Sequence, residues 1–394
     1  MLPAYLPMIL GMIGASMMIP VLPLYLTDRG ISLGATSVVL AAVGIGSLLG
    51  SLPAGELLGR FGEQATMLLA LVVMAVALAP LGLTDAVVVL VMLRIAFGMA
   101  SSALRLSRQT YITRRIETAQ RGRALSFVGG SFRVAALIGP FVGGALVDVI
   151  GFRSTFVVAA SVGLLGLGPA LWTSATPIPL LPEVERAAGR ELGVIAGVRV
   201  HWRRVLLGGP VQLLVMAARE GRFVVLPLIA DELGMSATEV GILVTISTAA
   251  DLVLFPAAGF VMDRYGRLYA MVPSFSLIVV GLLLLAGADT AAGVTVAAAV
   301  MGIGNGLGAG TMLTLGSDLA PADAAGPFLA GMALMQGGGR ILGALLVGIV
   351  GDALGLGAAS VALAIVLLVA IGWIVGVIGD SSAPERIRAA SLLR

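Results

Sequence analysis

The chain contains an internal repeat at a constant shift of 204 residues, and this repeat restricts the possible folds more than any other feature. The segment from Gly55 to Gly62 recurs from Gly259 to Gly266 without an insertion. Other pairs in the same register are Leu22 and Leu226, Pro23 and Pro227, Gly98 and Gly302, Gly139 and Gly343, Asp148 and Asp352, and Gly151 and Gly355. A repeat unit of about half the chain indicates duplication of a whole domain, not a short solenoid repeat.

Each copy is too apolar for a soluble domain. Hydrophobic residues make up 59% of the chain and charged residues 11%, against roughly 25% charged residues in soluble domains. The apolar stretches are about 20 residues long, which is enough for a helix to cross a bilayer. We therefore predict an all-α membrane protein. The absence of cysteine excludes disulfides, thiolate metal sites and cysteine nucleophiles.

The apolar stretches predict twelve transmembrane helices in two six-helix bundles. The expected spans are 4–26, 35–57, 65–84, 87–110, 123–147, 154–174, 208–230, 237–260, 268–287, 292–317, 325–350 and 355–379. Residues 1–174 and 208–380 form the two bundles, with a cytoplasmic linker at 175–207 and a cytoplasmic tail at 381–394. An even number of spans in each half makes the halves parallel repeats.

The arginines predict the orientation in the membrane. Ten lie in one set of short loops and the tail and five in the linker, fifteen in all, whereas the opposite loops hold only Arg29 and Arg153. Basic residues accumulate on the cytoplasmic side. We expect a multi-pass protein of the plasma membrane, the inner membrane of a bacterium, with both termini cytoplasmic.

Three motifs resemble the major facilitator superfamily of secondary transporters. The first is a Gly-x-x-x-Asp-Arg-x-Gly loop after spans two and eight, with Gly55, Arg60 and Gly62 in one copy and Gly259, Asp263, Arg264 and Gly266 in the other. The second is Arg94-Ile-Ala-Phe-Gly98 on span four. The third, Gly139-Pro140-Phe-Val-Gly143-Gly144 on span five, is similar to a motif of drug/proton antiporter-like exporters. The resemblance implies a small-molecule substrate, alternating access and a cytoplasmic gate at the repeated loop.

The loop residues also have a physical interpretation. Gly55 and Gly259 allow a helix end to approach its neighbour closely, and Gly62 and Gly266 permit the turn back into the membrane. The motif arginines can pair with carboxylates or with helix C-termini. The first copy departs from the family pattern at Gly59, where aspartate is expected, and Glu56 and Glu63 are candidates to replace it. Small residues of the span-five motif favour close helix packing.

Polar residues within the spans mark a candidate substrate cavity. Ionisable side chains at membrane depth cost about 2.5–3.5 kcal/mol each and usually face the bundle interior. The candidates are Arg94, Ser101, Arg133, Arg219, Arg222, Asn305, Gln336 and Arg340. Alternatives remain: Arg94 has a structural or coupling role as readily as a substrate contact, Asn305 can join helices, and Asp251 can pair with Arg340 or Arg222. Arg105 and Arg108 share the polar stripe of span four with Arg94.

Seven arginines within the spans face only two deep carboxylates, Glu220 and Asp251. Guanidinium groups suit bidentate contact with carboxylate or phosphate, so we expect a proton-coupled exporter of an anionic or zwitterionic organic compound. Glu220 is the first candidate for the proton carrier and Asp251 the second. The alternatives are a broad-specificity multidrug exporter, a lysolipid flippase and a non-transporting receptor or scaffold.

An enzyme is not expected. The single histidine, His201, lies in the linker and cannot build a histidine metal cluster. We expect no cofactor, no metal and no nucleic-acid partner, and we expect a monomer in the lipid bilayer.

Overall fold

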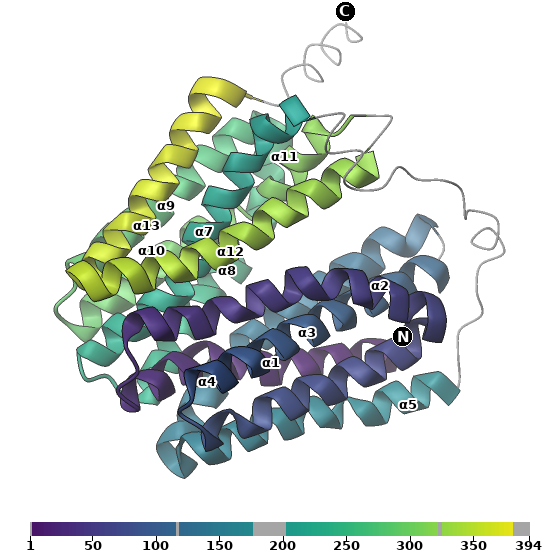
Figure 1. The fold of residues 1–394 in the computed structure, drawn as a ribbon. Helices are drawn as coiled ribbons and strands as arrows, with labels where there is room; N and C mark the ends of the chain where they lie inside the picture. Colours follow the sequence, from purple (N-terminus) through teal and green to yellow (C-terminus); the bar gives the residue numbers. More distant parts are fainter. Residues whose placement is uncertain (1, 116–117, 176–201, 322–324, 381–394) are drawn as a thin grey trace, which may run out of the picture. The chain divides into compact units, whose positions relative to one another are not determined.

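The computed structural model describes residues 2–115, 118–175, 202–321 and 325–380, and every regular element within these ranges is a helix (Figure 1). The chain forms two compact units. Unit 1 holds residues 1–189 together with 234–245, and unit 2 holds 190–233 together with 246–394. Most of the predicted linker at 175–207, and the predicted tail at 381–394, lie outside the described residues.

Unit 1 is a bundle of long helices. They are α1 (Leu2–Asp28), α2 (Leu33–Leu78), the 3-10 helix η1 (Ala79–Leu83), α3 (Val87–Arg115), α4 (Thr118–Leu165) and α5 (Leu167–Ala175). The backbone of α2 turns sharply at Gly62 (φ 78°, ψ 173°), and that of α4 turns at Gly151 (φ 76°, ψ 169°). Only glycine adopts such angles readily, so each of these helices contains two spans. The turn predicted at Gly62 is thereby confirmed.

Unit 2 repeats this plan with one exception. Its helices are α7 (Trp202–Glu232), most of α8 (Ala237–Tyr265), α9 (Arg267–Ala286), α10 (Ala291–Leu307), α11 (Thr311–Leu319), α12 (Ala325–Leu354), α13 (Leu356–Trp373) and the π-helix η3 (Ile374–Ile378). The sequence predicts one continuous span at 292–317. The structure divides it, because α10 ends at Leu307 and α11 begins only after Gly310, whose φ is 79°.

The described helices account for twelve membrane spans. Ten stretches are long and apolar enough to cross a bilayer. One of them, at 130–172, contains the turn at Gly151 and therefore holds two spans. α7 is not among the ten, and it carries Arg219, Glu220 and Arg222 near its middle. With the second span of 130–172 and with α7, the ten stretches become twelve, and the predicted all-α fold with six spans in each half of the chain is confirmed.

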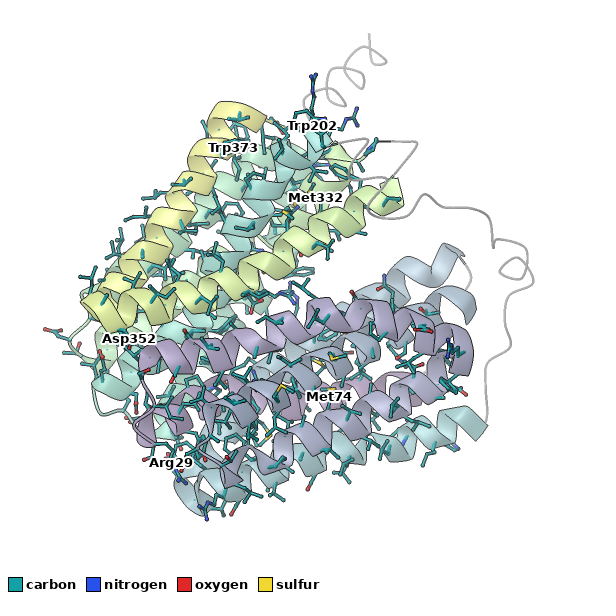
Figure 2. All side chains as sticks on the ribbon, viewed as in Figure 1. Arg29, Met74, Trp202, Met332, Asp352 and Trp373 are labelled. Carbon is teal, nitrogen blue, oxygen red and sulfur yellow. The ribbon has the colours of Figure 1, made fainter. Side chains whose placement is uncertain are left out.

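Tryptophans mark one end of unit 2. Trp202 and Trp373 lie at this end and Asp352 at the opposite end (Figure 2). The indole nitrogen of Trp373 donates a hydrogen bond of 3.0 Å to the carbonyl of Leu207. Trp202 is more than half exposed. Tryptophan is enriched where a protein crosses the boundary between lipid and water, so this end of unit 2 suits a membrane interface.

Glycines allow helix backbones to touch in both units. In unit 1, a Cβ at Gly143 would lie 2.6 Å from the carbonyl oxygen of Met17, and one at Gly139 would lie 2.9 Å from the Met17 nitrogen. In unit 2, a Cβ at Gly343 would lie 2.8 Å from the carbonyl carbon of Ala217. These contacts are shorter than van der Waals contact, so α1 with α4 and α7 with α12 need glycine there. The close packing predicted for the span-five motif is present.

The first residues of α8 belong to unit 1. The backbone nitrogen of Thr238 donates a hydrogen bond of 2.8 Å to the Asp148 carboxylate at the end of the span-five helix. Gly144 lies against the carbonyl of Ala237, and the hydroxyl of Thr245 donates to the carbonyl of Leu137 at 3.1 Å. Residues 234–245 are therefore joined to α4 by polar contacts and by a glycine contact.

Candidate functional site

An ion pair joins α7 to α12 near the middle of unit 2. Nε of Arg340 lies 3.5 Å from Oε1 of Glu220. The Glu220 side chain is 41% exposed and the Arg340 side chain 37% exposed, so both border open space. The sequence offered Arg340 as a partner of Asp251, but its ion pair is with Glu220. A pair of this kind can exchange its partners for charged groups of a ligand.

Arg222, a predicted cavity residue, is buried between α7, α8 and α10. Its side chain is 3% exposed, and Nη1 donates to the carbonyl of Met301 at 3.1 Å and to the hydroxyl of Ser247 at 3.4 Å. The guanidinium also interacts electrostatically with Asp251 and then with Glu220. Arg222 thus connects α7 to α8 and α10, and its positive charge interacts with Glu220 of the ion pair.

Arg219 contacts a backbone carbonyl at the interruption between α10 and α11. Its Nη2 donates to the carbonyl of Gly308 at 2.9 Å, and its guanidinium lies 5.5 Å from the centre of the Phe275 ring. The negative end of the α10 dipole lies at this carbonyl, so the contact is favourable. Arg219 and Arg222 are neighbours on α7, but they act on different backbone groups.

The two remaining cavity candidates of unit 2 lie on α12 and α10. The amide nitrogen of Gln336 donates to Oε1 of Gln212 at 2.8 Å, and Gln212 in turn donates to the carbonyl of Met312 at 2.6 Å. Gln212 is 1% exposed. Asn305 is half-buried on α10. The glutamine chain connects α12, α7 and α11, so Gln336 joins helices through Gln212.

The polar residues of span four differ in their exposure. Arg94 is 9% exposed, its guanidinium lies 5.4 Å from the Phe97 ring, and its Nε has no hydrogen-bond partner among the described residues. Arg108 is also buried and lies 5.0 Å from the Tyr111 ring, whereas Arg105 is exposed. The shared polar stripe of these three arginines stays a prediction.

The other candidates of unit 1 lie on α3 and α4. The Ser101 hydroxyl donates to the carbonyl of Gly98 at 2.9 Å, within its own helix. Arg133 is half-buried on α4. Arg94, Ser101 and Arg133 all belong to unit 1, whereas the Glu220–Arg340 pair belongs to unit 2.

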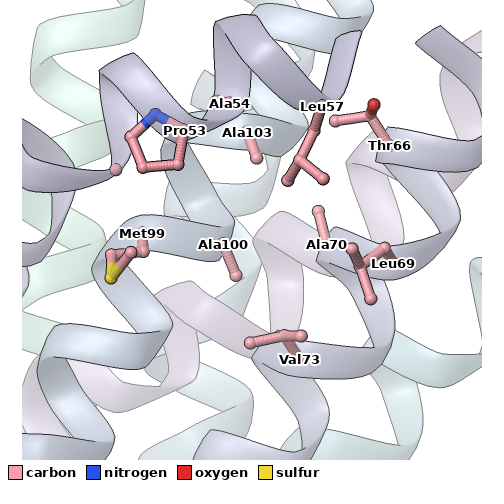
Figure 3. Close-up of a pocket in the computed structure, with 11 residues that line it drawn as sticks. Pro53, Ala54, Leu57, Thr66, Leu69, Ala70, Val73, Met99, Ala100 and Ala103 are labelled. Carbon is pink, nitrogen blue, oxygen red and sulfur yellow. The ribbon is translucent and has the colours of Figure 1, made fainter. Parts of the chain in front are cut away.

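A separate pocket of about 160 Å³ lies within unit 1 (Figure 3). It is bounded by the two halves of α2 and by α3, with lining residues Gly50, Pro53, Ala54, Leu57, Thr66, Leu69, Ala70, Val73, Met99, Ala100 and Ala103. The only hydroxyl in the lining, that of Thr66, donates to the carbonyl of Gly62 at 2.8 Å. The pocket contains none of the predicted site residues and offers no charge to a polar substrate.

The first gate motif, Gly55–Gly62, forms the end of the first helical half of α2 and the turn at Gly62. Arg60 pairs with Glu56 one helical turn earlier, with Nη2 and Oε1 2.6 Å apart, and both side chains are more than 60% exposed. Glu56 thus supplies a carboxylate partner for the motif arginine, while Glu63 is buried. A Cβ at Gly55 would meet no atom within 4 Å. The close helix approach predicted for this glycine is absent among the described residues.

The second gate motif, Gly259–Gly266, is held by a residue just outside it. Asp263 and Arg264 are exposed, and Arg264 lies near the Phe260 ring at 6.0 Å. Gly266 has φ 110° and makes the predicted turn, while Gly259, like Gly55, has open space around it. Arg267 forms the ion pair of this loop, with its Nε 3.2 Å from Asp318 at the end of α11.

Sequence reasoning missed several residues that organise unit 2: Gln212, Ser274, Arg267, Asp318 and Asp380. Gln212 had a visible signal, because an amide within an apolar span requires a partner. Asp318 and Arg267 also had a visible signal in the repeat. Asp318 corresponds to Arg114 and Arg267 corresponds to Glu63, so both copies hold residues of opposite charge at these two positions. The Ser274 hydroxyl donates to the carbonyl of Gly304, a contact that no pattern indicates.

Two sets of six membrane-spanning helices, with charged side chains buried along α3 and α7, define a polytopic membrane protein of the transporter type. The family model described as Major Facilitator Superfamily matches residues 5–218 and again 208–391. The chain belongs to the major facilitator superfamily, and it spans between 24% and 66% of the length of the curated relatives described below. The resemblance inferred from the three motifs is confirmed.

Curated relatives include exporters. The chain is 28% identical over 371 residues to a tetracenomycin C resistance and export protein of Streptomyces glaucescens, covering 76% of this chain and 66% of that protein. It is 30% identical over 150 residues to the multidrug resistance protein MdtG of Klebsiella pneumoniae, covering 37% and 36%. A match of 36% identity to an uncharacterized MFS-type transporter of Mycobacterium tuberculosis covers 38% of this chain and 24% of that protein.

Solved structures share the fold. The nucleoside transporter NupG, in a mutant form, has a TM-score of 0.78 at 14% identity, covering 95% of this chain and 98% of that one. A bacterial homolog of the human lysosomal transporter Spinster, in an inward-facing and unoccupied conformation, has a TM-score of 0.78 at 13% identity, covering 94% and 95%. At these identities the likeness concerns the fold alone.

Proposed function

We propose that the protein exports a small zwitterionic organic compound in exchange for protons, by alternating access between its two six-helix bundles. The observation that supports this most directly is the Glu220–Arg340 pair of unit 2. It is half-exposed near the middle of α7 and α12, and the buried guanidinium of Arg222 lies close enough to interact electrostatically with Glu220. The exporters among the relatives support the direction of transport.

The Glu220–Arg340 pair determines whether proton and substrate are exchanged or transported together. A zwitterion can place its ammonium on the Glu220 carboxylate and its carboxylate on Arg340, where guanidinium geometry is suited to it. A proton on Glu220 removes the first contact, so proton and substrate compete and the protein exchanges one for the other. A simple anion would instead take only Arg340, and protonation of Glu220 would promote its binding. Linkage is reciprocal, so an anion predicts co-transport in place of exchange.

The test uses proteoliposomes with an imposed pH gradient and a panel of zwitterions, organic anions, lipophilic cations and lysolipids. We expect Glu220→Gln to abolish the response of transport to the gradient. Asp289→Asn is the matched control, because Asp289 is an exposed carboxylate between α9 and α10. A Glu220→Gln variant whose transport still follows the pH gradient would exclude Glu220 as the proton carrier, and Asp251→Asn would then be tested.

The second candidate function is broad-specificity multidrug export, which the name of MdtG favours. Substitution of Arg340 separates the two functions. Under the zwitterion hypothesis, Arg340→Gln abolishes zwitterion export. If Arg340→Gln continues to export lipophilic cationic dyes, and the wild type moves no zwitterion, the multidrug function is correct. Transport of lysolipids alone would instead favour the flippase.

A further inference from the structure

The interruption of span ten exists in only one of the two repeats. In unit 2, Gly308 ends α10, Gly310 adopts φ 79°, and α11 starts at Thr311. At the equivalent positions of unit 1, residues 104–106 lie inside the uninterrupted helix α3. A helix interruption within a membrane leaves backbone groups that need partners from the protein. The duplicated scaffold therefore changed at this point in one copy.

Three side chains of α7 hold α11 along its length. Arg219 donates to the carbonyl of Gly308 just before α11, at 2.9 Å. Gln212 donates to the carbonyl of Met312 in its first turn, at 2.6 Å. Arg204 donates to the carbonyl of Leu319, the last residue of α11, at 3.4 Å. At 1.5 Å per residue, α11 is about 14 Å long, and these contacts run from just before its first residue to its last.

Gly308 must lack a side chain for this arrangement. A Cβ there would lie 2.7 Å from Nη2 of Arg219. The same carbonyl also accepts a hydrogen bond of 2.6 Å from the hydroxyl of Thr311. Gly308 thus brings a charged donor onto the backbone at the end of α10, where the helix dipole favours a cation.

The far end of α11 is attached to the second gate motif. Asp318 pairs with Arg267 at 3.2 Å, and both side chains are largely buried. Nη1 of Arg267 donates to the carbonyl of Met262 at 3.3 Å, and its backbone nitrogen donates to the Asp380 carboxylate at 3.2 Å. One short helix therefore connects Arg219, the neighbour of Glu220 on α7, with the second gate motif at Gly259–Gly266.

We propose that α11 moves as one rigid segment about the hinge at Gly308–Gly310, and that Arg219 is the positioning residue that links this movement to the substrate site. The linkage rests on the proposed function, because Glu220 must exchange partners during transport. When α7 responds to that exchange, the contacts of Arg219, Gln212 and Arg204 carry the displacement to α11, which then shifts Asp318 against Arg267. Charged hydrogen bonds are the stronger kind, so Arg219 is the principal contact of the three.

The rigid-segment part is tested by amide hydrogen exchange on the purified full-length protein, without substrate or pH gradient. Loss of a charged hydrogen bond raises the equilibrium constant for local opening of the helix by roughly tenfold or more. We expect both Arg219→Gln and Asp318→Asn to raise exchange about tenfold across the whole of residues 311–319. Arg264→Gln is the control, because Arg264 is exposed and its guanidinium lies near the Phe260 and Tyr265 rings of its own helix. Increased exchange confined to the mutated end of α11 would show fraying and overturn the proposal.

The movement is tested separately by cross-linking. The chain has no cysteine, and a Cβ at Gly316 of α11 would lie 3.4 Å from the Leu329 side chain of α12. We expect the double variant Gly316→Cys with Leu329→Cys to lose pH-driven transport when a short bifunctional thiol reagent that reducing agent cleaves joins α11 to α12, and to regain it on reduction. Undiminished transport by the cross-linked protein would refute the movement of α11. Failure of proton coupling in Glu220→Gln would leave the exchange result standing, so the two proposals can fail independently.

Discussion

Replacing Gly343 with alanine should separate α7 from α12 and weaken the ion pair at the candidate site. A Cβ at this position would lie 2.8 Å from the carbonyl carbon of Ala217, and that carbon belongs to the α7 backbone. The carbonyl oxygen of Ala217 would lie closer still, and ordinary contact begins at 3.4 Å, so the helices must move apart by more than the 0.6 Å that separates 2.8 Å from 3.4 Å. Backbone atoms have no rotamer that relieves this contact.

The same displacement reaches the Glu220–Arg340 pair, because Gly343 and Ala217 are each about one helical turn from its members. The pair distance of 3.5 Å would lengthen by a similar amount to about 4.1 Å, beyond the 4 Å limit of an ion pair. Overpacking of this kind costs about 1–3 kcal/mol. Alanine regains up to about 1 kcal/mol from its higher helix propensity, so the net loss is roughly 0–3 kcal/mol.

The control is Gly372→Ala on α13, where an added Cβ meets no atom within 4 Å. The gain in helix propensity applies to both variants, so their difference in stability, about 1–3 kcal/mol, isolates the contact with Ala217. The assay is the thermal unfolding midpoint of each purified variant, combined with pH-driven transport in proteoliposomes. A Gly343→Ala protein as stable as Gly372→Ala, or with undiminished proton coupling, would refute this reasoning.

Two further predictions concern the loops. Gly62→Ala should lower stability by about 1–3 kcal/mol because φ 78° and ψ 173° suit only glycine. Gly266→Ala should cost more, since its Cβ would also lie 3.1 Å from Cγ of Asp380; equal thermal midpoints for the two variants would contradict this. Arg29→Gln should change stability by less than about 1 kcal/mol, because the Arg29–Asp85 pair (3.1 Å) is partly exposed and screened. A thermal shift as large as that of Gly266→Ala would show that this pair is essential.

Hydrophobic pattern and repetition predicted the helices, their grouping into six and six, and the turns at Gly62 and Gly266. These features depend on local properties: the length of an apolar stretch, and the angles that only glycine adopts. The repeat also exposed the asymmetric positions, such as Glu220 and Asp251. It did not reveal the interruption of span ten, because Gly308 and Gly310 resemble the packing glycines at Gly302 and Gly304.

What the sequence alone determined is therefore the class of protein, the scaffold and the set of charged residues within the membrane. The partners of those charges were decided only by the tertiary structure. Arg340 forms an ion pair with Glu220, Arg222 donates to the carbonyl of Met301, and Arg219 donates to the carbonyl of Gly308. The physical reason is that a helical pattern gives the face on which a side chain lies, whereas its partner depends on how neighbouring helices pack. That packing is set by backbone contacts at glycines such as Gly343, which the hydrophobic pattern does not encode.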